Sequence, residues 1–361
     1  MIKRLGILTG GGDAPGLNAV IRAAVKTAAI TYGCEMIGIQ NGYDGLVEPG
    51  RTRPLGVNDV AGLLSRGGTI LGTANRGNPF ARKVIRDGQE VVEDITQRVV
   101  EGYQRLGLDG LIVLGGDGTL RIAHELTQRF GLSILGVPKT IDNDLNGTDV
   151  TFGFDTALQT ATEALDKLQT TAESHHRVMV LELMGRDAGF ITLHAGVAGD
   201  ADVILIPEIP YDIDVVCGKI TEREANGRRF SIVAVAEGAR PLGGQQSLLR
   251  PADAVFVARL GGVGHQVGAL VEQLTGKETR VTVLGHLQRG GSPSAFDRWL
   301  ATRFGAAAAR LAADGGWGRM VGLRGQIVGD VPIAEAIAVP KRVNPQGEPV
   351  QAARGIGVVF G

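Results

Sequence analysis

Cysteine and long hydrophobic runs are both scarce in this sequence. Only Cys34 and Cys217 occur among the 361 residues, so there is no disulfide framework and no CxxC pair. Unpaired thiols suit a reducing compartment, and we therefore expect a cytoplasmic protein. No window reaches the roughly 18 uncharged apolar residues of a membrane span, and the opening MIKRLGILTGGG lacks the apolar stretch of a signal peptide. We expect neither export nor a membrane partner.

An excess of charge of either sign is also missing. The 37 basic side chains nearly balance the 38 acidic ones, which leaves a formal net charge of -1. Such a chain offers no basic field for a polyanionic backbone, so we do not expect nucleic acid as a partner. Any anionic ligand must be bound by local groups. Glycine, in contrast, is abundant at 55 residues, roughly twice its average share, and we expect it to concentrate in functional loops.

Short aliphatic runs alternate with amphipathic, Ala-rich stretches along the chain. Uninterrupted apolar strands that alternate with helices predict a parallel sheet covered on both faces. The predicted strands are Leu5–Leu8, Met36–Ile39, Leu111–Leu114, Ile134–Val137, Val178–Leu183, Val203–Ile206, Ser231–Ala236 and Arg280–Leu284. The predicted helices are Asn18–Ala29, Thr119–Phe130, Thr156–Thr171, Val215–Glu224, Pro251–Leu274 and Phe296–Asp314.

The predicted strands fall into two groups, one ending at about Asp149 and one starting at about Thr151. Each group is large enough for a doubly wound sheet. We therefore predict an α/β fold with two similar doubly wound lobes, mainly parallel sheets and a cleft between them. Ligands of such sheets collect at the carboxyl ends of the strands, where the Gly-rich and Asp-rich turns of this sequence lie. We expect the tail from about Lys341 to be loose.

The first such turn is Thr9–Gly16, with the sequence TGGGDAPG, between the first strand and the first helix. Its backbone N–H groups and the positive end of the helix could bind a phosphate. A tight structural turn is the alternative interpretation. The turn is neither GxGxxG nor a Walker loop, so it does not support a dinucleotide oxidoreductase.

The second turn is Gly115–Thr119, with the sequence GGDGT, again between a strand and a helix. Glycine lets the chain approach a phosphate closely, and Asp117 could hold a hydrated Mg²⁺ against it. The alternative is that Asp117 only caps the helix.

The third turn is Pro138–Asp144, with the sequence PKTIDND. It presents two carboxylates, Asp142 and Asp144, close to the cation of Lys139 and the hydroxyl of Thr140. Phosphoryl transfer needs a group that accepts the proton of the attacking hydroxyl and a centre that organises Mg²⁺. Ordinary turn-stabilising hydrogen bonds of the Asp and Asn side chains are the alternative.

Together with MGRDAGF at 184–190 and GHLQRGG at 285–291, these turns resemble the phosphofructokinase A family, in order from Ile2 to about Arg298. The loop GGDGT also occurs in NAD kinases and diacylglycerol kinases, so the specificity of the match comes from PKTIDND, MGRDAGF and GHLQRGG. The resemblance implies the phosphofructokinase fold and an Mg²⁺-dependent 6-phosphofructokinase of glycolysis. Such an enzyme phosphorylates the 1-hydroxyl of fructose 6-phosphate and gives fructose 1,6-bisphosphate.

The resemblance also implies roles for the two lobes. We expect residues 1–150 with about 276–315 to form the donor lobe, which binds the nucleotide and Mg²⁺. Residues 151–275 with about 316–361 are then the sugar-phosphate lobe.

By the same resemblance, donor phosphates lie against Gly12 and the second turn, whose members are Gly115, Gly116, Asp117, Gly118 and Thr119. Asp117 is the expected Mg²⁺ ligand and Asp142 the expected base. The expected supporting catalytic residues are Thr140, Asp144 and Arg186.

Fructose 6-phosphate is expected to contact Thr140 and Asp142 together with Met184, Gly185, Arg186, Glu237, His286 and Arg289. Arg177 and Arg280 are expected to reach in from a neighbouring subunit, which implies a homodimer or homotetramer with shared active sites. Guanidinium and imidazole groups suit a phosphate dianion, and a carboxylate suits a sugar hydroxyl. Without the resemblance, Arg177 could be a surface charge, His286 a core histidine and Met184 core filler. His175 and His176 lack further ligands at metal-binding spacing, so no zinc site is predicted.

Two positions associated with donor choice point in opposite directions. Gly118 matches nucleotide-using members, whereas pyrophosphate users generally place Asp there; Lys139 matches the pyrophosphate users. We give Gly118 more weight, because a side chain there would obstruct the nucleotide. The pattern resembles the mixed-substrate group of the family, and we expect ATP, then ADP, then pyrophosphate as donor. Asn75 replaces an Arg of the familiar ATP enzymes, and Arg76 is the candidate substitute in the donor site.

Other activities remain as alternatives. The acceptor could be another sugar phosphate such as sedoheptulose 7-phosphate, or the chain could be a non-catalytic sugar-phosphate-binding regulatory subunit. All three carboxylates, Asp117, Asp142 and Asp144, are present, which argues against the regulatory subunit. Arg22 and Lys26 fall where regulated relatives bind effectors, but they could equally be the solvated face of the first helix.

Overall fold

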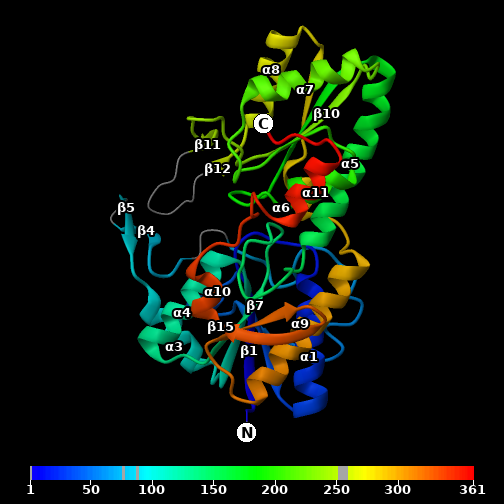
Figure 1. Ribbon diagram of the computed structural model, residues 1–361. Coiled ribbons are helices and arrows are strands. Elements are labelled where there is room, and N and C mark those ends of the chain that lie inside the picture. The colour runs from blue at the N-terminus through cyan, green and yellow to red at the C-terminus, as the bar shows by residue number, and fades with distance from the viewer. Residues whose placement is uncertain (1, 75–77, 87–88, 251–258) are drawn as a thin grey trace.

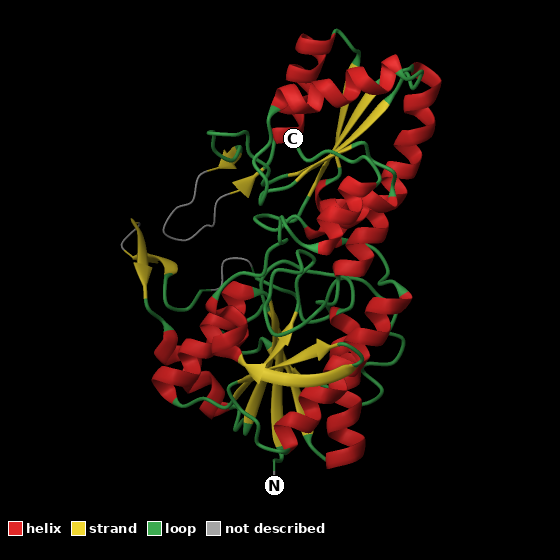
Figure 2. Cartoon of the chain, in the orientation of Figure 1, coloured by secondary structure: helices red, strands yellow, loops and turns green. Residues whose placement is uncertain are grey.

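The computed structural model describes residues 2–74, 78–86, 89–250 and 259–361. Figure 1 shows two α/β lobes, one around the N-terminus and one around the C-terminus, and Figure 2 shows that helices flank the strands of both. None of the helices in the described ranges combines the length and the apolar character needed to cross a membrane.

The described residues of the first lobe form a seven-stranded sheet with the order β15-β14-β7-β6-β1-β2-β3. The five central strands, from β14 to β2 in this order, run parallel to one another. The two edge strands, β3 and β15, each pair antiparallel with the adjacent strand. The strands are β1 (Arg4–Thr9), β2 (Glu35–Ile39), β3 (Thr52–Pro54), β6 (Gly110–Gly115), β7 (Ile134–Pro138), β14 (Arg319–Arg324) and β15 (Ile327–Pro332).

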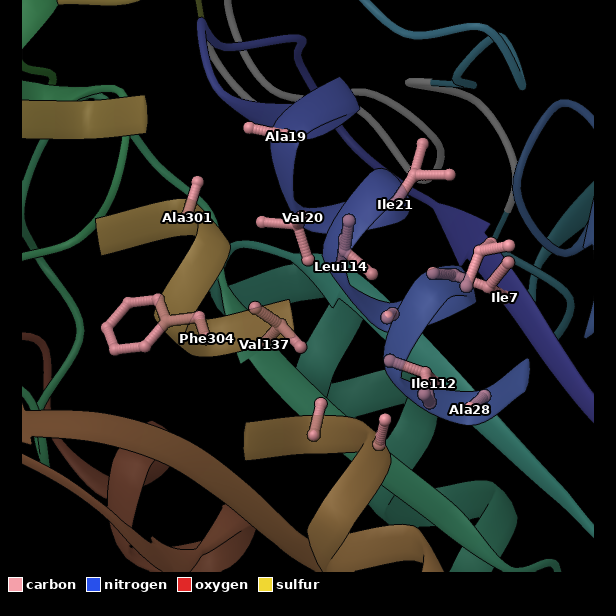
Figure 3. Packing of buried hydrophobic residues seen from close by; sticks show 14 of the residues in the cluster. Ile7, Ala19, Val20, Ile21, Ala28, Ile112, Leu114, Val137, Ala301 and Phe304 are labelled. Carbon is pink, nitrogen blue, oxygen red and sulfur yellow. The ribbon is translucent and has the colours of Figure 1, made fainter. Parts of the chain in front are cut away.

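Helices cover both faces of this sheet because its strands are apolar on both sides. Ile112 and Leu114 of β6 face α1 (Leu17–Tyr32) and α9 (Ala295–Ala313), as Figure 3 shows. The alternate residues Leu111 and Val113 pack on the opposite side. The helices there are α2 (Asp44–Val47), α3 (Thr96–Arg105) and α4 (Asp117–Phe130). This two-sided burial is what an uninterrupted apolar strand predicts.

The described residues of the second lobe form a parallel four-stranded sheet with the order β13-β8-β10-β9. The strands are β8 (Val178–Leu183), β9 (Val203–Leu205), β10 (Ser231–Ala236) and β13 (Thr279–Val283). One face is covered by α5 (Phe154–His175), α6 (Phe190–Ala198) and α11 (Glu348–Gly355). The other face is covered by α7 (Ile213–Ala225) and α8 (Val263–Thr275).

Smaller elements complete the chain. The hairpin of β4 (Arg82–Arg86) and β5 (Gln89–Glu93) projects from the first lobe, and a second small sheet pairs β11 (Leu248–Arg250) with β12 (Arg259–Leu260). The 3-10 helix η1 (Gly285–Arg289) follows β13, and α10 (Ile333–Ala338) follows β15.

All eight predicted strands are confirmed, and five of the six predicted helices are confirmed with ends that differ by a few residues. The helix predicted from Pro251 is wrong at its start. Residues 251–258 lie outside the described residues, Arg259 and Leu260 are β12, and α8 begins only at Val263. Gly261 and Gly262 have φ angles of 137° and 87°, so the backbone cannot be helical there.

The C-terminal tail is ordered rather than loose. It includes α11, Val359 bridges to Val203 of β9, and Phe360 is only 3% exposed. The prediction for the tail is therefore wrong. Its polar composition hid the apolar residues that pack against the second lobe.

The lobe boundaries predicted after residue 275 are wrong in two places. β13 lies in 276–315 but pairs with β8 in the second sheet, and β14 and β15 lie in 316–361 but complete the first sheet. Strand pairing is non-local, so an apolar run alone does not say which sheet it joins. The chain consequently passes between the lobes at 149–153, 284–294 and 339–347.

Candidate functional site

The turns at the carboxyl ends of the strands bring the two lobes together. The guanidinium of Arg289, at the end of η1, donates to the carbonyl of Asp13 over 3.1 Å. The charge of Arg186 acts on Asp144, and the charge of Asp142 acts on Glu237. Groups from the turns after β1, β7, β8, β10 and β13 therefore form one polar centre.

The two glycine turns meet at Thr119. A Cβ atom on Gly10 would lie 2.6 Å from Cγ2 of Thr119, and one on Gly115 would lie 2.3 Å from Cβ of Thr119. Side chains at these two positions would collide with Thr119, so glycine is needed to close the contact. Thr119 is buried, and its carbonyl accepts a hydrogen bond from the hydroxyl of Tyr43. Thr119 thus holds the predicted phosphate turns against each other.

Asp117 lies in the first turn of α4, and the N-cap is Gly116. The alternative in which Asp117 caps the helix is wrong, because its carboxylate instead pairs with Nε of Arg121 at 2.8 Å. Gly118 is exposed, and a Cβ atom built there meets nothing within 4 Å. A helix N-terminus, an open position and a carboxylate lie side by side, which is a favourable place for an anion and a cation together.

Lys139 connects the third turn to the first. Its side chain is buried, and its Nζ donates to the carbonyl of Gly12. Burial, assisted by the charge of Arg289, lowers the pKa of Lys139 to about 8, while nearby carboxylates oppose the change. The side chain therefore remains mostly cationic at neutral pH beside the turn predicted to bind phosphate.

Asp142 is buried and Asp144 is half-buried, and the Oδ1 atom of each is enclosed without a hydrogen-bond partner. Burial and the charge of Asp142 raise the pKa of Asp144 to about 6. The backbone N–H of Asp142 donates to Oγ1 of Thr140 over 3.0 Å. Turn-stabilising contacts come instead from Asn143, whose Oδ1 accepts from the N–H of Thr151. Free buried carboxylate oxygens can accept a proton or face a cation.

The turn after β8 is held from two sides. The N–H of Arg186 donates to Oε1 of Glu237 over 3.1 Å, and the N–H of Met184 donates to Oε1 of Gln288 over 2.8 Å. Gly185 and Arg186 have φ angles of 145° and 53°, and the value at Arg186 is strained for a residue with a side chain. Burial raises the pKa of Glu237 to about 7, although the bond from Arg186 opposes this change.

Gln288 is a site-supporting residue that the sequence prediction missed. It is completely buried, and it lies in GHLQRGG between the predicted residues His286 and Arg289. The GHLQRGG motif was therefore the sequence feature from which a role for Gln288 could have been predicted. His286 is exposed, so the alternative of a core histidine is wrong. Arg289 lies against Gly12, where a Cβ atom would come within 2.8 Å of its guanidinium.

Arg177 and Arg280 lie at the opposite end of the second sheet. Arg177 precedes β8, Arg280 is near the start of β13, and the register pairs Thr279 with Val178. Both guanidiniums form ion pairs with Glu278. A six-residue strand such as β8 spans roughly 20 Å. The structure therefore does not bring these two arginines to the site of their own chain.

The structure does not test the roles predicted for four residues. Asn75 and Arg76 lie outside the described residues. Arg22 and Lys26 are half-buried on α1. The described ranges contain no group of three or more His, Cys, Asp and Glu side chains that could hold a metal ion.

Comparison with known proteins identifies the relatives of this chain. The family described as phosphofructokinase matches residues 4–312. A relative from Chloroflexus aggregans, named ATP-dependent 6-phosphofructokinase, is 56% identical over 99% of this chain and 98% of its own length. A relative from Streptomyces coelicolor, named pyrophosphate–fructose 6-phosphate 1-phosphotransferase, is 50% identical over 99% of this chain and 100% of its own length. The crystal structure of Pichia pastoris phosphofructokinase in the T-state matches with a TM-score of 0.79 and 34% identity, over 99% of this chain and 37% of that one.

Proposed function

The chain belongs to the phosphofructokinase family, and we propose that it is a 6-phosphofructokinase that transfers a phosphoryl group from ATP to fructose 6-phosphate. The product is fructose 1,6-bisphosphate, a step of glycolysis. The observation that carries the proposal is the pair Asp142 and Asp144, whose Oδ1 atoms are enclosed and unpartnered. The two carboxylates interact electrostatically with Lys139 of the first lobe, and Asp144 also with Arg186 of the second.

We assign the general base to Asp142. Its Oδ1 is buried and unpartnered, so it is free to accept the proton of the 1-hydroxyl of the sugar. Asp144 and Thr140 hold the turn around it. Fructose 6-phosphate contacts the turn after β8, Glu237 directly after β10, and the residues His286 and Arg289. A carboxyl group with a pKa near 7, as in Glu237, is suited to a sugar hydroxyl.

Asp117 fits the role of an Mg²⁺ ligand. Mg²⁺ usually keeps several waters and takes one or two carboxylates together with the phosphates of the substrate, so it does not require a cluster of protein ligands. The partly exposed carboxylate of Asp117 lies beside the open position at Gly118 and supplies such a ligand. When bound, Mg²⁺ neutralises negative charge on the donor phosphates.

The choice of ATP over pyrophosphate rests on the open space at Gly118 and on the names of relatives that are 51–56% identical. The second candidate is a pyrophosphate-linked enzyme, which Lys139 and the Streptomyces coelicolor relative favour. Initial rates with fructose 6-phosphate and either ATP, ADP or pyrophosphate test both candidates in parallel. We expect the highest rate with ATP. A higher rate with pyrophosphate would replace the first candidate by the second, and no rate with any donor would refute both.

Replacing Gly118 with aspartate should weaken the use of ATP far more than the use of pyrophosphate. The fold should tolerate the change, because the new Cβ meets nothing within 4 Å. Only a nucleotide extends an α-phosphate past this turn, and a carboxylate would obstruct and repel it. The measurement is kcat/KM for both donors, with Gly118→Ala as the uncharged control. Equal losses for both donors would indicate general damage to the turn instead.

The ATP affinity should fall as the pH rises through about 8, where Lys139 loses its proton. A lysine with a lowered pKa is charged below that value and neutral above it. The charged fraction is roughly nine-tenths at pH 7 and a tenth at pH 9. The KM for ATP should therefore rise between these values, while Lys139→Met should show a high KM that does not respond to pH. The same pH response in that variant would assign it to another group.

We also propose a homo-oligomer, because Arg177 and Arg280 can reach a sugar phosphate only in a neighbouring subunit. A two-fold arrangement of antiparallel neighbours would bring one chain's Arg177 to the other chain's Met184. The unpaired thiols Cys34 and Cys217 support a reducing compartment such as the cytoplasm.

A further inference from the structure

The segment 339–347 passes between the lobes on its way from α10 to α11. Figure 1 shows α10 beside the first sheet, and α11 with α6 in the other lobe. Lys341 lies in this segment and is half-buried, with side-chain contacts to both lobes. Burial lowers the pKa of Lys341 to about 8, although the charges of Asp149 and Asp144 oppose this effect.

Toward the first lobe, Lys341 binds the turn that carries the catalytic carboxylates. Its backbone N–H donates to the carbonyl of Asp144 over 2.9 Å. Its Nζ donates to the carbonyls of Asp149 and Thr148 over 2.6 and 3.2 Å. Hydrogen bonds to a charged donor are stronger than neutral ones, so these contacts fix the backbone from 144 to 149.

Toward the second lobe, the same ammonium lies over the ring of Phe190, 5.3 Å from its centroid. Phe190 is the last residue of MGRDAGF and the first of α6, so it follows the turn that holds the sugar phosphate. Two residues further along the segment, the N–H of Val343 donates to Glu208, which also accepts from the N–H of Gly189. The segment is thus attached to the start of α6 at two points.

We propose that Lys341 is a positioning residue for phosphoryl transfer, which sets the distance between the Asp142–Asp144 turn and the sugar-binding turn at Met184–Arg186. This inference rests on the proposed function. The side chain of Lys341 acts through the carbonyls of Thr148 and Asp149 on one side and through Phe190 on the other. Among the described residues, the side-chain contacts of Lys341 do not include the two glycine turns of the first lobe, so we expect the donor site to change less than the sugar site.

Replacing Lys341 with methionine retains the length of the side chain and removes the donors and the charge. We expect kcat to fall and the KM for fructose 6-phosphate to rise, each by about tenfold, because sub-ångström misplacement of reacting groups is costly. The KM for ATP should stay within about twofold of the parent, because we expect the donor site to change less. Lys341→Arg retains the charge and donors and should recover much of the loss.

Lys219→Met is the matched control. Its side chain is 16% exposed and pairs with Glu222 on α7, within the second lobe alone. Both KM values should be unchanged in this variant. Binding of fructose 6-phosphate without donor, measured by calorimetry, should be weakened only in Lys341→Met. If that variant fails to fold, Phe190→Leu tests the same link from the other lobe and should give the same separation of KM values.

The inference is overturned if Lys341→Met retains the parent's kcat and sugar KM, or if its KM for ATP rises as much as its KM for the sugar. It is also overturned if Lys219→Met produces the same pattern. Failure of the proposed function would look different. In that case the parent chain itself would give no turnover of fructose 6-phosphate with any of the three donors.

Discussion

Replacing Asp142 with asparagine should lower kcat by a factor of about 10²–10⁴, the usual cost of losing a general base. The amide has the same shape as the carboxylate but cannot accept the proton of the 1-hydroxyl. The KM for fructose 6-phosphate and the melting temperature should change little, because Oδ1 of Asp142 has no protein partner to lose. Steady-state kinetics and thermal unfolding of the purified variant make the comparison.

Asp187→Asn is the control for this experiment. Asp187 lies in the neighbouring MGRDAGF turn, but it is exposed and contacts Gln246. Its replacement should leave kcat within about twofold of the parent, as expected for a surface position. A near-normal kcat in Asp142→Asn would exclude Asp142 as the base. The same variant should also lower the pKa of Asp144, because it removes the like charge that raises it.

Variants Arg177→Ala and Asp142→Ala should each be nearly inactive alone and should regain activity when they are reassembled as mixed oligomers. The reason is the position of Arg177, at the far end of β8 from Met184. A mixed pair about a two-fold axis contains one site with an intact Asp142 and a neighbour's intact Arg177. Random pairing makes half of the pairs mixed, so at most about a quarter of all sites recover.

The control mixture combines Asp142→Ala with Arg186→Ala. Arg186 and Asp144 interact within one chain, and Asp142 lies on the same turn as Asp144, so neither site of a mixed pair is intact. This mixture should show no recovery. If the Arg177 mixture also shows none, with mixed oligomers verified by mass, then Arg177 serves its own subunit or no site at all.

The positions of the strands were predictable because burial on both faces requires an uninterrupted aliphatic run. The run Val178–Leu183 gave the ends of β8, and with them the separation of Arg177 from Met184. Sheet membership was not predictable in the same way. β13 and β14 are both short strands of five and six residues, yet they pair with β8 and β7 in different lobes. That choice depends on partners far away in the sequence.

Site residues could be predicted from the sequence where they belong to a motif with recognisable chemistry. Residues that reach the site only through tertiary packing could not be predicted. The carboxylates of PKTIDND could be named from their residue types and spacing. Lys341 could not, because it lies in a polar segment with Pro340 and Asn344, and its burial arises only when the two lobes meet. Gln288 lies inside the GHLQRGG motif, but its role depends on η1, which places the side-chain amide oxygen where it accepts from the N–H of Met184.

The repeated passage of the chain between the lobes affects how the protein emerges from the ribosome. β7 is translated long before its sheet neighbour β14, with the whole second sheet in between. At 5–20 residues per second, roughly 10–40 s separate the two strands. During this interval β7 is an open edge, and the apolar face of α1 lacks its cover of α9. Until the hairpin of β14 and β15 closes the first sheet, the open edge of β7 leaves a nascent chain exposed to pairing with other chains.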